Sequence, residues 1–142
     1  MADPRSRQLK LLGMILFLLG LIAGLILMNF KNPRMGLSAH LEGVMNGLFL
    51  VVAGIIWQDL QLPARLQNIL YATLLYGTFA NFTFTLLSAI LGTSKTTPIA
   101  GAGYSGTMIT ENLVTGGLVS VGISMLVALG LLCYGLGRKK TD

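Results

Sequence analysis

Four long apolar segments constrain this chain more than any other feature of its sequence. They run over residues 11–30, 37–57, 66–91 and 109–136 and carry almost no charged side chains. A helix needs about 20 apolar residues to cross a hydrocarbon core of about 30 Å. The sequence therefore predicts an all-α fold, an integral membrane four-helix bundle that forms a single domain over residues 1–142.

The composition agrees with a membrane protein. The chain is 54% hydrophobic and 11% charged, with a mean hydropathy of +0.75, whereas soluble domains average about 25% charged residues. The first apolar segment is longer than the core of a signal peptide, and no small-residue cleavage site follows it. We expect this segment to be retained as a helix and the chain to insert in a bacterial inner membrane.

Basic residues at the segment ends predict the orientation. One set lies at the N-terminus, in the second loop and at the C-terminus, and a smaller set lies in the other two loops: Arg5, Arg7, Lys10, Arg65, Arg138, Lys139 and Lys140 against Lys31, Arg34 and Lys95. Both termini of this multi-pass protein are therefore expected in the cytoplasm. These flanks also explain the net charge of +5 without a nucleic-acid partner.

The third loop, residues 92–106, is rich in Gly, Ser and Thr. Its Gly101, Gly103 and Gly106 match the spacing of a dinucleotide-binding loop, but no βαβ unit surrounds them, so that function is rejected. A lid over a site and a plain flexible loop remain open. The single Cys133 offers neither a disulfide nor a metal cluster, and we expect it to be a small core residue.

His40 is the only histidine and lies near the start of the second apolar segment. An ionisable group at membrane depth is costly unless it has a partner or a task. Two interpretations remain open: a hydrogen bond to a neighbour, or an axial bond to a metal or haem iron. A single axial bond per chain would leave the opposite iron face open for catalysis.

Small residues recur at helix-packing spacing in three of the segments. They are Gly20 and Gly24; Gly43 and Gly47; and Gly116, Ser120 and Ser124. In the second segment His40, Gly43, Gly47 and Gly54 fall close to one helix face. This strip would admit either a flat macrocycle or a neighbouring helix, and spacing does not separate the two.

Polar side chains are expected to converge in the outer half of the bundle. They are Asn46, Asn81, Thr85, Ser88, Glu111, Asn112 and Thr115, with His40 and Glu42 nearby. Asn46 and Asn81 lie at similar depth, about ten residues from the outer ends of their helices. Glu42 and Glu111 lie near helix N-termini, where the helix dipole favours a negative charge, and we assign them that structural role.

The stretch Ala39-His40-Leu41-Glu42-Gly43-Val44-Met45-Asn46-Gly47 resembles the second-helix motif of the styrene-oxide isomerases. The resemblance covers about residues 36–136. The small size and the run Tyr76-Gly77-Thr78-Phe79-Ala80-Asn81-Phe82 favour the branch of this family that converts hydroxylaminobenzene to 2-aminophenol, a step of nitroaromatic degradation. The resemblance implies a homotrimer that holds haem b between subunits.

The resemblance also implies roles for individual residues. His40 would be the axial ligand of the haem iron, Asn46 would lie in the substrate pocket, and Asn81 matches a family asparagine. Thr85 stands where the family has a catalytic tyrosine, and a family aspartate falls near Gly77. We therefore take Asn46, Asn81 and Thr85 as candidate catalytic residues. Together with the glycine strip, His40, Gly43 and Gly47 are candidates for cofactor binding.

The implied activity is an intramolecular hydroxyl transfer on a small aromatic substrate, with iron as a Lewis acid at the N–O oxygen. The aromatic side chains Tyr76, Phe79, Phe82 and Phe84 are candidates for the wall of an apolar pocket. An epoxide isomerase that yields an aldehyde is the nearest alternative, although Thr85 weakens it. A small oligomeric transporter and a membrane subunit without chemistry of its own also remain. A transporter is disfavoured because both glutamates lie near helix ends.

Overall fold

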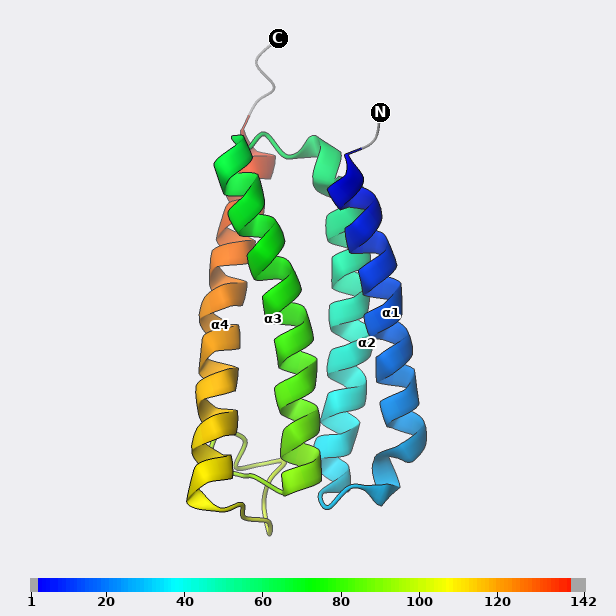
Figure 1. Ribbon diagram of the computed structural model, residues 1–142, viewed down its shortest axis with the longest axis vertical. Helices are drawn as coiled ribbons and strands as arrows, with labels where there is room; N and C mark the ends of the chain where they lie inside the picture. The colour runs from blue at the N-terminus through cyan, green and yellow to red at the C-terminus, as the bar shows by residue number, and fades with distance from the viewer. Residues whose placement is uncertain (1–2, 139–142) are drawn as a thin grey trace.

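The computed structural model describes residues 3–138, and this part of the chain is helical apart from its turns and loops. Four long helices run side by side along the long axis (Figure 1): α1 (Pro4–Ile26), α2 (Pro33–Ile56), α3 (Ala64–Leu91) and α4 (Met108–Gly137). Short 3-10 helices, η1 (Leu27–Asn29) and η2 (Trp57–Asp59), follow α1 and α2. Each long helix is long and apolar enough to cross a membrane. The predicted all-α, four-helix membrane fold is confirmed.

The first two helices begin earlier than hydropathy alone suggested, because polar caps precede them. The Asp3 carboxylate accepts a hydrogen bond from Arg5 N at 2.8 Å. The Asn32 side-chain oxygen accepts from Arg34 N at 3.0 Å and from Met35 N at 3.2 Å. A proline at the first position follows each cap, where its fixed φ suits a helix start. Helix α1 therefore starts at Pro4 rather than at residue 11.

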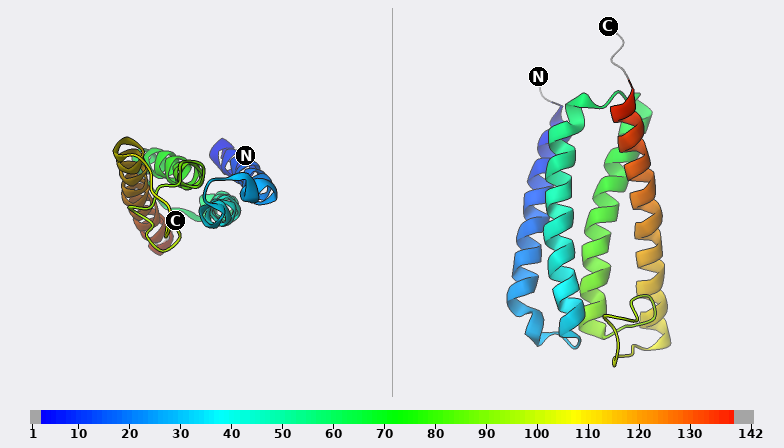
Figure 2. Two further views of the ribbon diagram at one scale, coloured as in Figure 1. Left: turned by 90° about the horizontal axis from the view of Figure 1, so that it is seen from below. Right: turned by 180° about the vertical axis from the view of Figure 1, so that it is seen from behind.

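The helices pack in chain order, α1 on α2, α2 on α3 and α3 on α4. Within the described residues α4 makes no comparable contact with α1 or α2, and the end-on view in Figure 2 places α1 and α4 at opposite edges. Helix α1 begins and α4 ends at the same end of the molecule (Figure 1). Two different grooves flank α2, one beside α1 and one facing α4.

Glycines set the distance between α1 and α2. A Cβ added at Gly20 would lie 2.6 Å from Val44 N, and one added at Gly13 would lie 2.6 Å from Gly47 O. No side chain fits at either place, so the two backbones touch. The predicted role of Gly20, Gly43 and Gly47 in helix packing is therefore confirmed.

On α4 the packing glycine is one residue away from the predicted one. Gly116 faces open space, whereas Gly117 packs against the ring of Phe84. The Ser124 hydroxyl donates to Thr73 O at 3.0 Å and ties α4 to α3. Cys133 is exposed on α4, so its predicted place in the core is wrong. The faces of this apolar helix differ little in hydrophobicity, so the sequence did not predict which face packs against α3.

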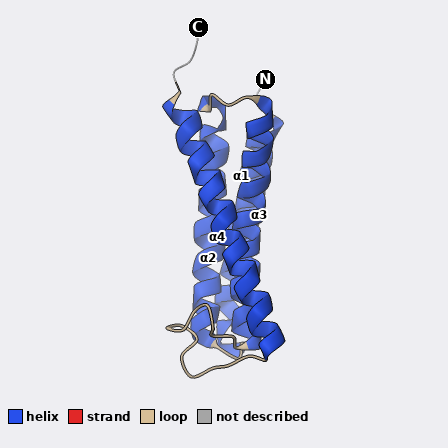
Figure 3. Ribbon diagram, turned by 90° about the vertical axis from the view of Figure 1, so that its left-hand side faces the viewer, coloured by secondary structure: helices blue, strands red, loops and turns tan. Residues whose placement is uncertain are grey.

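The loop between α3 and α4 covers the end of the bundle opposite the termini (Figures 1 and 3). Asn32 Nδ2 donates to Ala100 O at 2.9 Å. The Glu111 carboxylate accepts from the backbone N–H groups of Ser94 at 3.0 Å, Lys95 at 2.9 Å and Gly106 at 2.9 Å. Contacts to both α2 and α4 thus hold the loop in place, and Glu111 organises the loop as well as the start of its helix.

We expect Gly20→Val to lower the stability of the detergent-solubilised protein by about 1–3 kcal/mol, because the new side chain overpacks the α1–α2 contact. Gly130→Val is the matched control, since Gly130 lies on α4 with nothing within 4 Å of an added Cβ. Thermal unfolding of both variants is the measurement. Equal melting temperatures for the two would contradict the close packing of α1 on α2.

Candidate functional site

His40 lies on α2 and turns its ring toward α1. Its Nδ1 lies 2.9 Å from the backbone oxygen of Gly20. A carbonyl oxygen only accepts hydrogen bonds, so Nδ1 carries the proton and donates it. In a neutral imidazole this leaves Nε2 without a proton, with its lone pair free. The hydrogen bond to the backbone of α1 therefore favours the tautomer in which Nε2 is available to a metal.

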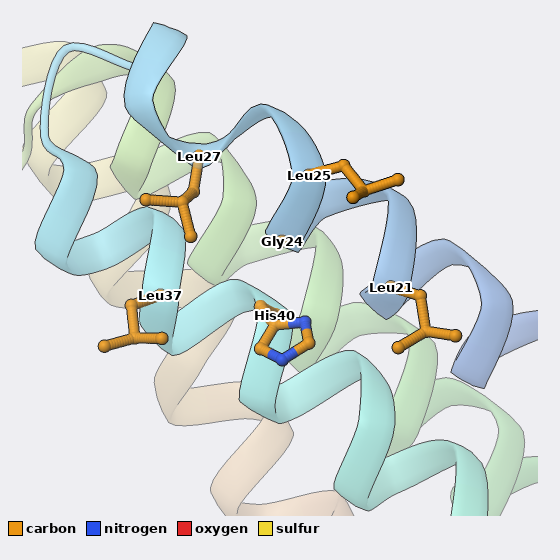
Figure 4. Close-up of a pocket in the computed structure, with 6 residues that line it drawn as sticks. All are labelled: Leu21, Gly24, Leu25, Leu27, Leu37 and His40. Atoms are coloured by element: carbon orange, nitrogen blue, oxygen red, sulfur yellow. The ribbon is translucent and has the colours of Figure 1, made fainter.

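An open groove of about 450 Å³ runs beside this ring (Figure 4). The imidazole of His40 is its one polar side chain. The other lining residues are apolar: Leu21, Gly24, Leu25 and Leu27 from α1 and η1, and Leu37 from α2. A Cβ added at Gly24 would lie 2.6 Å from His40 Nδ1. Gly24 therefore leaves the room that the ring occupies, and the groove offers a flat or aromatic ligand one nitrogen donor.

Gly43 and Gly47 do not line this groove. Both are buried where α2 meets α1, Gly43 against Gly20 and Gly47 against the backbone of Phe17. Of the two occupants considered for the glycine strip, the structure contains the neighbouring helix. The face of α2 that contacts α1 and the edge that carries His40 are adjacent but distinct, which the spacing of the residues did not resolve.

Asn46 and Asn81 are joined through the carboxylate of Glu42. Asn46 Nδ2 on α2 donates to Glu42 Oε2 at 3.0 Å, and Asn81 Nδ2 on α3 donates to the same oxygen. The predicted convergence of Asn46 and Asn81 is thus present in the structure. The assignment of Glu42 to the helix dipole was wrong, because α2 begins at Pro33 and has no acidic residue in its first turn; the Glu42 carboxylate instead joins α2 to α3. Its spacing of four residues from Asn46 was the sequence signal for this contact.

A second groove, of about 330 Å³, lies between α2 and α4. Glu42 and Asn46 form its polar part, and Met45, Phe49, Met125 and Leu129 form its apolar walls. None of the four aromatic residues expected to wall a pocket, Tyr76, Phe79, Phe82 and Phe84, lines it. Phe49 from α2 and two long α4 side chains, Met125 and Leu129, take that place.

Thr85 lies apart from this groove. It is buried on α3, one turn beyond Asn81, and is not among the residues that line the groove between α2 and α4. Ser88, one turn further, is buried and accepts a hydrogen bond from the hydroxyl of Thr93 at 2.7 Å. Of these three residues of α3, Asn81 is the one that forms a hydrogen bond with Glu42 within the described part of the chain.

The two grooves open on different sides of α2. His40 and Asn46 are six residues apart, which places them about 120° apart around a helix. The sector of α2 between them holds the buried Gly43 and Gly47, whereas the exposed apolar side chains Leu41, Met45 and Leu48 lie on the wider, outward part of the helix. One copy of the chain therefore turns its imidazole and its carboxylate–amide cluster in different directions. No group of three or more His, Cys, Asp or Glu residues that could hold a metal ion occurs within residues 3–138.

These features define a small four-helix membrane protein with a single tautomer-fixed histidine and a separate amide–carboxylate cluster. A family model described as styrene oxide isomerase matches residues 5–137, and the chain belongs to that family. The expected family and the expected enzyme class, an isomerase, are confirmed. Membership also decides against the transporter and the non-catalytic subunit.

Two relatives from Ectopseudomonas oleovorans resemble the chain over most of its length. Hydroxylaminobenzene mutase HabB is 42% identical over 144 residues, covering 98% of this chain and 88% of the relative. Hydroxylaminobenzene mutase HabA is 41% identical over 127 residues, covering 89% of this chain and 94% of the relative. No solved structure is significantly similar to the chain.

We expect Asn81→Leu to destabilise the protein by about 1–3 kcal/mol, because it leaves the partly buried Glu42 carboxylate with one donor fewer. Thr83→Val is the matched control on α3, since the Thr83 hydroxyl donates only to Phe79 O in its own helix. The two variants are compared by thermal unfolding in detergent. Equal melting temperatures for Asn81→Leu and Thr83→Val would show that the hydrogen bond between Asn81 and Glu42 does not stabilise the fold.

Proposed function

We propose that this protein is a haem-dependent isomerase that converts hydroxylaminobenzene to 2-aminophenol by transferring the hydroxyl group within the substrate. The observation that carries the proposal is the hydrogen bond from His40 Nδ1 to Gly20 O at 2.9 Å, beside an open apolar groove. The two mutase relatives, at 42% and 41% identity, support the choice of substrate. Styrene-oxide-type epoxide isomerisation is the second candidate, favoured by the family model.

The residues of the His40 groove fit haem b. They offer one imidazole nitrogen with a free lone pair and, around it, the leucine surface that a porphyrin prefers. His40 would hold the iron, while Leu21, Leu25 and Leu37 would contact the macrocycle. When bound, haem would supply an iron Lewis acid that polarises the N–O bond of the substrate.

The remaining residues bind and orient the substrate. Asn46 lies at the polar end of the groove between α2 and α4, where it can hydrogen-bond the N–H or the oxygen of an aryl hydroxylamine. Met45, Phe49 and Met125 suit an aromatic ring and limit the access of water to a cationic intermediate. Substrate and product are isomers, so the reaction needs no external oxidant or reductant. Asn81 acts through Glu42 rather than at the groove.

A homotrimer is part of this proposal. One chain directs the His40 groove and the Asn46 groove to different sides of α2, so neighbouring copies would complete the site between them. The exposed apolar side chains on the outward part of α2 suit a subunit interface, among them Leu41, Leu48 and Val52. We further propose a bacterial inner membrane as the location, with both termini in the cytoplasm.

Replacing the proposed iron ligand tests the haem site. We expect His40→Ala to lose the Soret band and the formation of 2-aminophenol, while the protein stays folded in the membrane, and we expect added imidazole to restore part of both. Leu37→Ala, which alters the same groove without removing the nitrogen, is the control and keeps the pigment. Absorption spectra and product chromatography are the measurements. A pigmented and active His40→Ala protein would exclude His40 as the ligand.

The pocket role of Asn46 makes a separate prediction. Asn46→Ala is expected to keep its haem content and to lose at least about tenfold in kcat/KM, since one hydrogen bond to the substrate disappears. Steady-state kinetics on hydroxylaminobenzene, with haem quantified in the same samples, is the measurement. A joint loss of pigment and rate would instead assign Asn46 a structural role.

A further inference from the structure

The groove between α2 and α4 is polar at one place only. Four of its six lining residues, Met45, Phe49, Met125 and Leu129, present sulfur, aromatic or aliphatic surface. Glu42 and Asn46 provide the polar atoms. A ligand in this groove therefore meets hydrogen-bonding groups at one end and apolar walls elsewhere. The orientation of the groups at that end decides which polar head the groove accepts.

The hydrogen bonds inside the cluster fix this orientation. Asn46 Nδ2 and Asn81 Nδ2 both donate to Glu42 Oε2. The Asn46 NH2 group therefore turns toward the carboxylate, and its carbonyl oxygen turns away. Among the described residues no hydrogen bond reaches Glu42 Oε1 or Asn46 Oδ1. Glu42 Oε1 and Asn46 Oδ1 can therefore accept hydrogen bonds from a ligand, whereas only the second N–H of the Asn46 amide can donate one.

We infer that Glu42 is a positioning and specificity residue, which sets the polar end of this groove to accept hydrogen bonds and so selects aromatic ligands whose head carries O–H or N–H donors. The inference rests on the proposed function only for the identity of the substrate, since hydroxylaminobenzene carries both an N–H and an O–H. It assigns Glu42 a task at the groove itself.

Anchoring by two helices makes the selection effective. Asn46 reaches Glu42 from one turn further along α2, and Asn81 reaches it from α3. A carboxylate held from two sides does not rotate to suit a different head. An analogue without a donor leaves the two acceptor oxygens desolvated and unpaired, whereas a donor satisfies them. Because such a hydrogen bond contributes about a factor of ten or more, the preference is large enough to measure.

Binding of three simple probes to the full-length protein tests the preference without any variant. Phenol carries an O–H donor, anisole carries only an ether acceptor, and ethylbenzene has the shape of anisole without its oxygen. We expect phenol to bind about tenfold more tightly than anisole, and anisole no more tightly than ethylbenzene. Ligand-detected NMR titration, corrected for detergent-only samples, gives the three constants. An anisole affinity equal to or above that of phenol overturns the inference.

Glu42→Gln tests the role of the carboxylate. The glutamine oxygen can still accept from Asn46 and Asn81, but an NH2 group replaces the free oxygen at the groove. The ratio of phenol to anisole affinity is expected to fall at least about fivefold, while the melting temperature changes little; a merely structural role would not move this ratio. Glu42→Asp, which withdraws both oxygens by one methylene group, is the second variant and is expected to weaken phenol alone. An unchanged ratio in either folded variant overturns the inference.

A pair of tryptophan variants on α4 locates the binding. Leu129 lines the groove, whereas Leu126 is 74% exposed and does not line it. Leu129→Trp is expected to abolish phenol binding and Leu126→Trp to preserve it; the opposite pattern overturns the assignment to this groove. These readouts do not depend on turnover. A protein that prefers phenol but does not convert hydroxylaminobenzene refutes the proposed function alone, and an active protein without the preference refutes the inference alone.

Discussion

The close contact between α1 and α2 at Gly20 is the interaction on which the rest of the site depends. Gly20 lets the two backbones touch, and its carbonyl oxygen also accepts the Nδ1 proton of His40 at 2.9 Å. A larger residue at Gly20 would separate the helices and withdraw that acceptor. Helix packing and the histidine tautomer therefore follow from one small residue, because a carbonyl within the helix reaches a neighbour only when the backbones approach closely.

A second constraint joins α2 to α3 deeper in the same half of the bundle. A carboxylate in an apolar setting needs donors, and Glu42 finds them in Asn46 and Asn81. These bonds tie the two helices together and also orient the amide that lines the groove beside α4. The same three side chains therefore hold α2 against α3, and two of them, Glu42 and Asn46, form the polar part of the proposed binding groove. Charged residues make up only 11% of this chain.

The sequence predicted the elements of the fold well and their contacts only in part. The four apolar stretches correctly predicted four helices long enough to span a membrane. The caps at Asp3 and Asn32 explain why α1 and α2 start earlier than expected. The faces of the helices were harder to predict. Helix α4 is apolar on all sides, so nothing in its pattern distinguished Gly116 from Gly117 or placed Cys133 at the surface. Amphipathic contrast, which orients helices in water, is weak in lipid.

The sequence by itself determined the class of the fold, the single histidine and the small residues that allow close packing, because these depend on composition and local spacing. Spacing also placed Asn46 and Asn81 at one depth. Only the tertiary structure decided that α1 fills the glycine strip, that Glu42 joins the two asparagines, and that α4 walls the second groove with Met125 and Leu129. Those features depend on which helix lies beside which, and on the rotation of each helix about its axis, which a nearly uniform apolar sequence does not encode locally.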